Sequence, residues 1–89
     1  MTVELFGMAR ALTGRASVEV DVAPPATLRK LLEALARAHP ELVGQVLAAG
    51  SCAPLAPHHV LLDGRRAASL DETLVDGDRP CLIVLPSGG

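Results

Sequence analysis

Aromatic side chains and lysine are almost absent from this sequence. Phe6 is the only Phe, Trp or Tyr among 89 residues, and Lys30 is the only lysine. The chain is nevertheless 49% hydrophobic, and nearly all of that fraction is aliphatic. Eight basic and ten acidic residues leave a net charge of −2, with no basic block. Because nucleic acids and anionic membrane surfaces are bound by clustered Lys and Arg, the sequence excludes both as partners.

Cysteine is scarce, and long hydrophobic runs are missing. Cys52 and Cys81 are far apart and do not form a CxxC pair. Strand-like sequence begins directly after Met1, so we expect no export signal and no membrane span. Two isolated thiols without an export signal are typical of a reducing compartment, which predicts a cytoplasmic protein. Cys81 lies within an apolar run and is expected to be a small buried side chain of a strand.

The first part of the chain predicts two strands in a single small domain. In a strand at residues 2–6, successive side chains would point to alternate faces, which places Val3 and Leu5 on one face and Phe6 on the other. Residues 16–22 alternate in the same way, with valine at 18, 20 and 22. The two segments are expected to form a hairpin with one buried face, connected by a turn at residues 8–15.

A helix is predicted next, because the hydrophobic period changes. Apolar residues recur at helical spacing and form one stripe: Leu28, Leu31, Leu32, Leu35 and Ala36. Thr27 is the expected N-cap, since its hydroxyl can accept a hydrogen bond from an amide of the first turn. Pro40 disfavours helical geometry at the preceding residue, so the helix should end near His39.

The second half of the chain is less regular. Residues 41–50 could form a short second helix, and residues 51–59, with two prolines, are expected to be a loop. Residues 60–64 predict a short strand that ends in an Asp-Gly turn. Residues 70–78 predict a brief helical turn followed by a second Asp-Gly turn. Residues 81–85 predict a last strand that is apolar at every position.

The predicted order is therefore β-β-α-β-β, in which one helix can cover only one face of the sheet. The strand at residues 81–85 is apolar on both sides, so the side that faces away from the helix, with Ile83 and Leu85, is left uncovered. Phe6 would lie on the same open face if the first and last strands are neighbours. This predicts a hydrophobic patch for a partner protein, formed by Phe6, Ile83 and Leu85. The alternative is that the middle segment folds back over this face.

The chain finishes with Pro86, Ser87, Gly88 and Gly89. A terminal α-carboxylate is ionised at neutral pH, and two glycines without Cβ atoms make a slim tail. Pro86 ends the strand, and four extended residues reach at most about 13–14 Å. We therefore expect a folded domain at residues 1–85 and a tail at 86–89 that enters another protein's active site. The alternative is an ordinary frayed terminus.

Three stretches of the chain resemble the MoaD/ThiS family of sulfur-carrier proteins: VELFGMARALTG at 3–14, PATLRKLLEALARAHPEL at 25–42 and TLVDGDRPCLIVLPSGG at 73–89. The resemblance implies the ubiquitin-like β-grasp fold, an α+β fold with a mixed sheet of about four to five strands packed on one main helix. The long middle segment is more similar to the MoaD branch than to the compact ThiS branch.

The resemblance also implies a mechanism centred on the carboxylate of Gly89. A ubiquitin-activating-like adenylyltransferase would adenylate it with ATP and Mg²⁺, and a sulfur donor protein would then convert it to a thiocarboxylate. In the MoaD branch the chain is the small subunit of molybdopterin synthase, and the large subunit holds the molybdopterin precursor that accepts the sulfur. The chain would bind no cofactor of its own and would act as a protein cosubstrate, so its status as an enzyme is left open.

Individual residues carry over from the family. Gly88 and Gly89 match the terminal pair, Phe6 matches a partner-facing aromatic position, and the partner surface extends through Pro86 and Ser87. Arg10 and Gly14 match the family's pattern for the first turn, and residues 76–78 match its turn before the last strand. Two segments depart from the family: residues 83–86 replace a common Phe-Pro-Pro segment, and residues 63–64 are Asp-Gly where many relatives have Asn-Gly. These departures affect the choice of partner rather than the carrier role.

Other functions stay open. The sulfur could go to thiamine thiazole or another metabolite, the chain could be a ubiquitin-like protein modifier joined through Gly89 to lysines, or it could be a β-grasp interaction module without carrier function. The open face could also pair two copies of the free chain. Acidic residues between 71 and 78 could steer docking near the tail or simply form a solvated turn. His58 and His59 would point to opposite faces of a strand, so no metal site is predicted.

Overall fold

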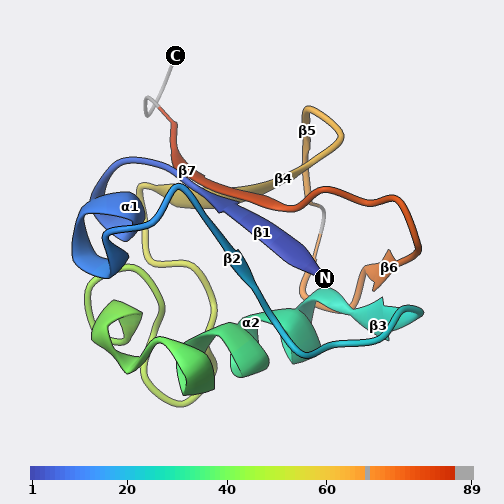
Figure 1. Ribbon diagram of the computed structural model, residues 1–89, viewed down its shortest axis with the longest axis horizontal. Helices are drawn as coiled ribbons and strands as arrows, with labels where there is room; N and C mark the ends of the chain where they lie inside the picture. Colours follow the sequence, from blue (N-terminus) through green and yellow to red (C-terminus); the bar gives the residue numbers. More distant parts are fainter. Residues whose placement is uncertain (68, 86–89) are drawn as a thin grey trace.

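The computed structural model describes residues 1–67 and 69–85. Its main sheet has five strands in the order β2-β1-β7-β4-β5, and a pair of short strands forms a second sheet. Both α-helices lie on one side of the main sheet (Figure 1). The elements in chain order are β1 (Thr2–Leu5), α1 (Met8–Thr13), β2 (Ser17–Glu19), β3 (Ala26–Thr27), α2 (Leu28–Ala38), the 3₁₀ helix η1 (Pro40–Leu42), β4 (His58–Leu62), β5 (Arg65–Arg66), β6 (Thr73–Leu74) and β7 (Cys81–Val84).

The sheet is mixed, and its topology is that of the predicted β-grasp fold. β1 pairs antiparallel with β2, with Val3 opposite Val18, and parallel with β7. β7 in turn pairs antiparallel with β4, with Leu82 opposite Val60. The first and last strands are therefore neighbours in the middle of the sheet, which places Phe6 beside the last strand.

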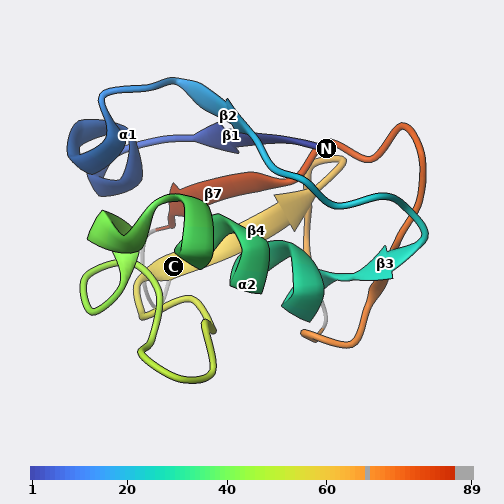
Figure 2. The same ribbon diagram turned by 60° about the horizontal axis from the view of Figure 1, so that its bottom comes forward.

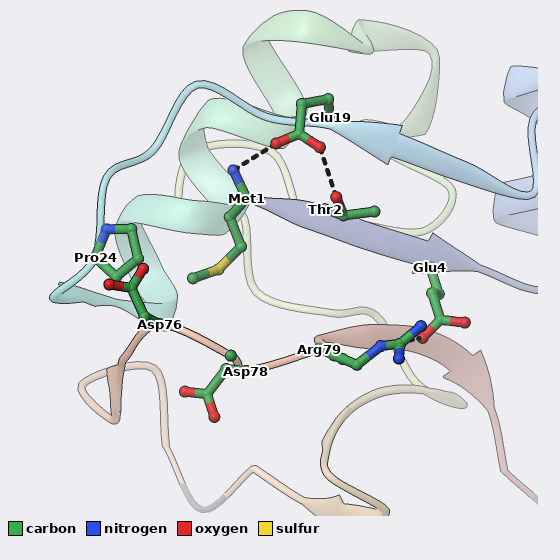
Figure 3. Close-up of a pocket in the computed structure, with 9 residues that line it drawn as sticks. Met1, Thr2, Glu4, Glu19, Pro24, Asp76, Asp78 and Arg79 are labelled. Atoms are coloured by element: carbon green, nitrogen blue, oxygen red, sulfur yellow. Dashed lines mark hydrogen bonds and ion pairs between the residues drawn. The ribbon is translucent and has the colours of Figure 1, made fainter.

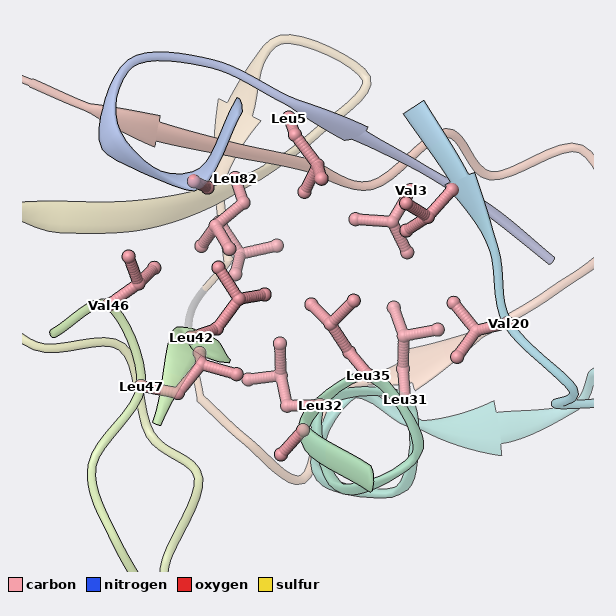
Figure 4. Close-up of a cluster of buried hydrophobic side chains, with 14 of the residues drawn as sticks. Val3, Leu5, Val20, Leu31, Leu32, Leu35, Leu42, Val46, Leu47 and Leu82 are labelled. Carbon is pink, nitrogen blue, oxygen red and sulfur yellow. The ribbon is translucent and has the colours of Figure 1, made fainter. Parts of the chain in front are cut away.

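The predicted main helix is confirmed in its position, its buried stripe and both of its ends. All five residues of the stripe at 28–36 are buried in α2. The Thr27 hydroxyl accepts a hydrogen bond from the Lys30 amide at 3.2 Å, which makes it the N-cap. The helix ends at Ala38, with His39 as its C-cap directly before Pro40. Figure 4 shows Leu31, Leu32 and Leu35 reaching from α2 toward Leu5 and Leu82 of the sheet.

The cap at Thr27 gives a direct stability test. We expect Thr27→Ala to lower the free energy of unfolding by about 1 kcal/mol, because a first-turn amide loses its partner. Urea unfolding followed by circular dichroism measures this difference. Thr27→Ser keeps the hydroxyl and should recover most of the lost stability, so an equal loss in both variants would contradict a capping role.

The connection at residues 8–15 is a helix rather than the predicted turn. α1 spans Met8–Thr13, and its residue Ala9 packs into the core. Gly14 closes the helix in the left-handed conformation at φ 70°, and its amide donates to the Arg10 carbonyl at 2.8 Å. Most residues of this segment are good helix formers, but six residues are too few to show a clear hydrophobic period.

The middle segment packs beside α2 and does not cover the open face. The short helix expected within residues 41–50 is only the one-turn η1 at Pro40–Leu42. After it the backbone turns back on itself, with the Gly44 amide donating to the Leu47 carbonyl at 2.7 Å. Leu42, Val46 and Leu47 are buried in the same core cluster as α2 (Figure 4). The alternative in which this segment folds back over the open face is therefore wrong.

Residues 70–78 also differ from the prediction. Instead of a helical turn, Thr73–Leu74 form β6, which pairs antiparallel with β3 at the start of α2. Leu74 is buried there, so burial and pairing with a distant segment override the local preference. The predicted turn that follows is present, and the Asp78 carboxylate accepts a hydrogen bond from the Val75 amide at 2.8 Å. Within residues 1–67 and 69–85, none of the helices has the length and hydrophobicity that a membrane span needs.

Candidate functional site

One face of the main sheet has no layer packed against it among the described residues. In β7, Leu82 is 1% exposed and faces the core, whereas Cys81 and Ile83 point to the opposite face and are partly exposed. Phe6, just past the end of β1, is 40% exposed. α2 and the middle segment lie together on one side of the sheet, which is below it in Figure 1 and toward the viewer in Figure 2. The prediction that one face of the sheet is left uncovered is thus confirmed for the described part of the chain, and Phe6 and Ile83 are among the side chains on that face.

Strand register shows which side chains share this open face. Glu4 lies beside Cys81, Cys81 opposite Leu61, and Leu61 opposite Arg66, so these four form one row across the sheet. In the next row toward the end of β7, Ile83 lies opposite His59. We call the surface formed by these rows and Phe6 the open face: Glu4, Phe6, His59, Leu61, Arg66, Cys81 and Ile83.

Hydrogen bonds hold the residues at the end of β7 in place. The Phe6 amide donates to the Leu82 carbonyl at 3.1 Å, and the Leu85 amide donates to the Pro57 carbonyl at 3.3 Å. Phe6, Ile83 and Leu85 therefore lie together at one end of the sheet, and their role in partner binding stays a prediction. Pro86, Ser87, Gly88 and Gly89 lie outside the described residues.

Two further apolar side chains near this end were missed by the sequence argument. Met8 is 45% exposed and Val84 is 42% exposed. Gly7, with φ 60°, makes the turn between Phe6 and Met8, and a Cβ at Gly7 would lie 3.9 Å from Val84 Cγ2. Val84 shares its side of the strand with Leu82 and would be expected in the core by alternation. Its exposure shows that the cover formed by the helices ends before this residue.

The acidic turn at residues 76–78 lies at the opposite end of the open face. It borders a cavity of about 500 Å³ that is also lined by Met1, Glu4, Glu19 and Arg79 (Figure 3). This turn precedes β7 and therefore lies at the opposite end of that strand from Leu85, the last residue that the structure describes.

Glu19 is the best-connected carboxylate of this cavity. The Thr2 hydroxyl donates to it, and the Met1 ammonium lies 2.9 Å away (Figure 3). These two groups hold the pKa of Glu19 below its ordinary value, with the hydrogen bond from Thr2 as the larger cause. The carboxylate is therefore ionised at neutral pH and joins the ends of β1 and β2.

The Cys81 thiol lies on the open face and is partly exposed, not fully buried as expected. Burial raises its pKa, and the nearby Glu4 carboxylate raises it further. Both effects disfavour the thiolate, which is the reactive form of cysteine. Cys81 is therefore a poor nucleophile at neutral pH.

The raised pKa of Cys81 predicts slow alkylation of this thiol in the folded protein. At pH 8, iodoacetamide should alkylate Cys81 in the folded protein more slowly than in urea, because a raised pKa leaves less thiolate at any given pH. Glu4→Gln removes one of the two causes and should speed the reaction in the folded protein. Peptide mass mapping over time, with Cys52 as the internal reference, measures both rates. Equal rates for folded and unfolded Cys81 would contradict the assignment.

The two adjacent histidines point to opposite sides of β4. His58 is 5% exposed, and its Nδ1 lies 2.9 Å from the Leu55 carbonyl, whereas His59 is partly exposed opposite Ile83. Because a carbonyl can only accept, Nδ1 carries the proton of that hydrogen bond. In the part of the chain that the structure describes, no group of three or more His, Cys, Asp or Glu side chains could hold a metal ion.

The sequence model of the ThiS family matches residues 3–89. The chain belongs to the ThiS family. A comparison with curated proteins gives no significant match. Together with its structural neighbours, the match identifies a ubiquitin-like sulfur carrier of the ThiS/MoaD type and confirms the resemblance stated from the sequence.

Solved structures of similar proteins cover nearly the whole ThiS-family chain. SAMP1 from Haloferax volcanii is 33% identical, with 99% of this chain and 97% of that chain covered and a TM-score of 0.80. A Pyrococcus furiosus protein assigned as molybdopterin converting factor subunit 1 is 26% identical, with 93% of each chain covered and a TM-score of 0.73. The BexX/CysO complex from Amycolatopsis orientalis matches at 20% identity over 99% of this chain and 98% of that chain, with a TM-score of 0.72. At that identity the last match supports the β-grasp fold alone.

Proposed function

We propose that this chain carries sulfur as a thiocarboxylate on Gly89 and delivers it to a molybdopterin precursor, as the small subunit of a molybdopterin synthase. The observation that carries the proposal is the position of the exposed apolar side chains. Phe6, Met8 and Val84 are exposed and Ile83 is partly exposed, and all four lie near the end of β7, where the chain continues into residues 86–89. A partner that binds this surface would receive the tail at its own active site.

The chemistry explains why the body of the protein needs no catalytic side chain. A carboxylate is a poor acylating group, because its oxygen is a poor leaving group. A partner enzyme would transfer AMP from MgATP to the Gly89 carboxylate and release pyrophosphate. A persulfide sulfur from a donor protein would then form the C–S bond while the bond to AMP breaks, and reduction of the resulting acyl disulfide by a thiol would leave the thiocarboxylate. This sulfur is an ionised nucleophile that can attack the acceptor without release of free sulfide.

The test is formation of the thiocarboxylate. Intact-mass spectrometry is carried out after incubation of the chain ending at Gly89 with a ThiS/MoaD-type activating enzyme, MgATP and a persulfide donor. Replacement of one carboxylate oxygen by sulfur raises the mass by about 16 Da. Incubation of the product with a molybdopterin synthase large subunit and precursor should restore the original mass. Absence of the first gain with an enzyme that is active on its own carrier contradicts the carrier role.

A second candidate is covalent attachment to other proteins, which is favoured by the 33% identity to SAMP1, a small archaeal modifier protein. In that case an amine of a target lysine, rather than sulfur, would displace AMP from Gly89. The two functions are separated by the same reaction mixture. Loss of the sulfur only in the presence of precursor and large subunit supports the synthase. Products of raised mass on added proteins support a modifier, and transfer to a thiazole synthase in place of the large subunit supports thiamine synthesis.

A further inference from the structure

A cavity of about 280 Å³ lies at the edge of the main sheet where β5 ends. β5 lies outside β4, and the ladder between them stops at the hydrogen bond from the Ala67 amide to the Val60 carbonyl, which is 2.9 Å long. His58, His59 and Val60 of β4 line the cavity beyond this point, and small side chains of the preceding loop complete one wall. We call this feature the edge cavity.

Carboxylates are missing from the edge cavity: within residues 1–67 and 69–85, no Asp or Glu side chain lines it. Three other cavities of the domain each border at least one carboxylate, in keeping with a net charge of −2. The edge cavity instead borders Arg66, which is exposed and has no carboxylate within 4.0 Å of its guanidinium in the described part of the chain. The planar fork of a guanidinium matches the oxygens of a phosphate or a carboxylate. The edge cavity therefore favours an anion.

Further hydrogen-bond donors lie around the edge cavity. The Ser69 Oγ accepts from the Asp71 amide at 3.2 Å, so its own proton remains available to a ligand. His59 lies diagonally across the ladder from Arg66, because Leu61 is the residue opposite Arg66. A neutral imidazole always has one N–H donor. Arg66, Ser69 and His59 can thus each donate to an anion in the cavity.

His58 contributes a different kind of group. This side chain is 5% exposed, and its Nδ1 donates its proton to the Leu55 carbonyl at 2.9 Å. With the proton on Nδ1, the Nε2 atom of the neutral ring is an acceptor. Among the described residues, this Nε2 is a buried side-chain atom without a hydrogen-bond partner. A buried acceptor that lacks a donor costs free energy, so a ligand that brings an O–H to this nitrogen gains affinity.

These two requirements together select the ligand. It has to be an anion for Arg66, and it has to carry an O–H for Nε2 of His58. Inorganic phosphate keeps at least one proton at neutral pH and has acceptor oxygens besides, whereas a carboxylate or a sulfate is fully ionised and only accepts. We propose that the edge cavity binds a phosphate group, with its oxygens accepting from Arg66 and Ser69 and its O–H donating to His58. The group could be free phosphate or the monophosphate of a nucleotide.

The edge cavity lies beside the end of β7. His59 is opposite Ile83, and the Pro57 carbonyl accepts a hydrogen bond from the Leu85 amide. A bound phosphate would therefore place negative charge next to the apolar surface on which partners are proposed to dock. Phosphate binding does not depend on sulfur transfer, so failure of either proposal leaves the other intact.

The test is titration of the ¹⁵N-labelled full chain with sodium phosphate, sodium sulfate and AMP at constant ionic strength and about pH 6.5, where a phosphate monoester keeps part of its second proton. We expect phosphate to shift the amide signals of His59, Val60 and Ser69 and the Nε2 signal of His58, with a Kd of about 1–10 mM. Sulfate should bind at least about fivefold more weakly, because it offers no O–H to Nε2. Binding of AMP at least as tight as that of phosphate assigns the nucleotide as the source, and weaker binding assigns free phosphate. No shift at about 50 mM phosphate, or equal affinity for sulfate, would overturn the proposal.

Variants assign the contacts. Arg66→Gln should weaken phosphate binding about tenfold or more, because charge-assisted hydrogen bonds are lost. Arg37→Gln removes the same charge from α2, outside the lining of the edge cavity, and should leave the affinity unchanged. His58→Phe keeps a ring but removes both nitrogens, so it should bind phosphate and sulfate equally; if it does not fold, the Nε2 signal of the parent decides the same point. A folded His58→Phe variant that still prefers phosphate, or equal effects of the two arginine variants, would contradict the assignment.

Discussion

A variant with one alanine added after Gly89 should show no mass gain with the activating enzyme, MgATP and a persulfide donor. The added residue displaces the reacting carboxyl carbon by up to about 3.3–3.6 Å and places a Cβ beside it. A displacement of about 1 Å can lower the rate of a positioned reaction about 100-fold, so a shift of this size should abolish activation. Intact-mass spectrometry measures the loss directly, because the unextended chain gains about 16 Da on exchange of one carboxylate oxygen for sulfur.

The matched control carries the same extra alanine elsewhere. Insertion after Ala49, in the exposed turn on the helix side, gives a chain of identical mass that still ends at Gly89. This control should gain sulfur normally, and both variants should have the thermal unfolding midpoint of the parent within a few degrees. Sulfur gain by the C-terminally extended variant would show that the position of the last carboxyl group is not what the enzyme recognises.

The parts of the fold that could be predicted are those in which a strong local signal agrees with the tertiary structure. In α2, five apolar residues at helical spacing, a Thr cap and a following proline all indicate the same helix, and the structure has it between Leu28 and Ala38. α1 and β6 were missed because each is short. β6, with Thr73 and Leu74, is a strand only because β3 pairs with it, and no pattern within two residues can show that.

In the candidate site, too, the features with a local sequence signal were predicted and those that depend on distant segments were missed. Alternation of side chains along residues 2–6 placed Phe6 on the face away from the core, and the uninterrupted apolar run at 81–85 predicted that one side of the last strand, with Ile83, would be uncovered. Met8 and Val84 were missed because their exposure depends on where the helices stop covering the sheet. Alternation along β7 predicts that Val84 is buried, but this side chain is exposed and extends the apolar surface around the end of β7.

Leu82 and Ile83 are adjacent in sequence and should respond to substitution in opposite ways. Leu82 lies in the core, in contact with the cluster that includes Leu5 and Leu35, whereas Ile83 lies on the open face. We expect Leu82→Ala to lower the free energy of unfolding by about 2–5 kcal/mol, through lost transfer energy and a cavity. For a domain of this size that is a large part of a total stability of about 5–13 kcal/mol. Urea unfolding measures it.

Ile83→Glu should leave stability within about 1 kcal/mol of the parent, because the new carboxylate is solvated in the free protein. On binding it would have to be desolvated against an apolar partner surface, so affinity should fall about 30-fold or more. Isothermal titration calorimetry with a molybdopterin synthase large subunit, and separately with the activating enzyme, measures the loss for each partner. An affinity unchanged for both would remove the open face from the mechanism. A loss for one partner only would show that the two enzymes dock on different parts of the surface, with Met8 and Val84 as the next residues to test.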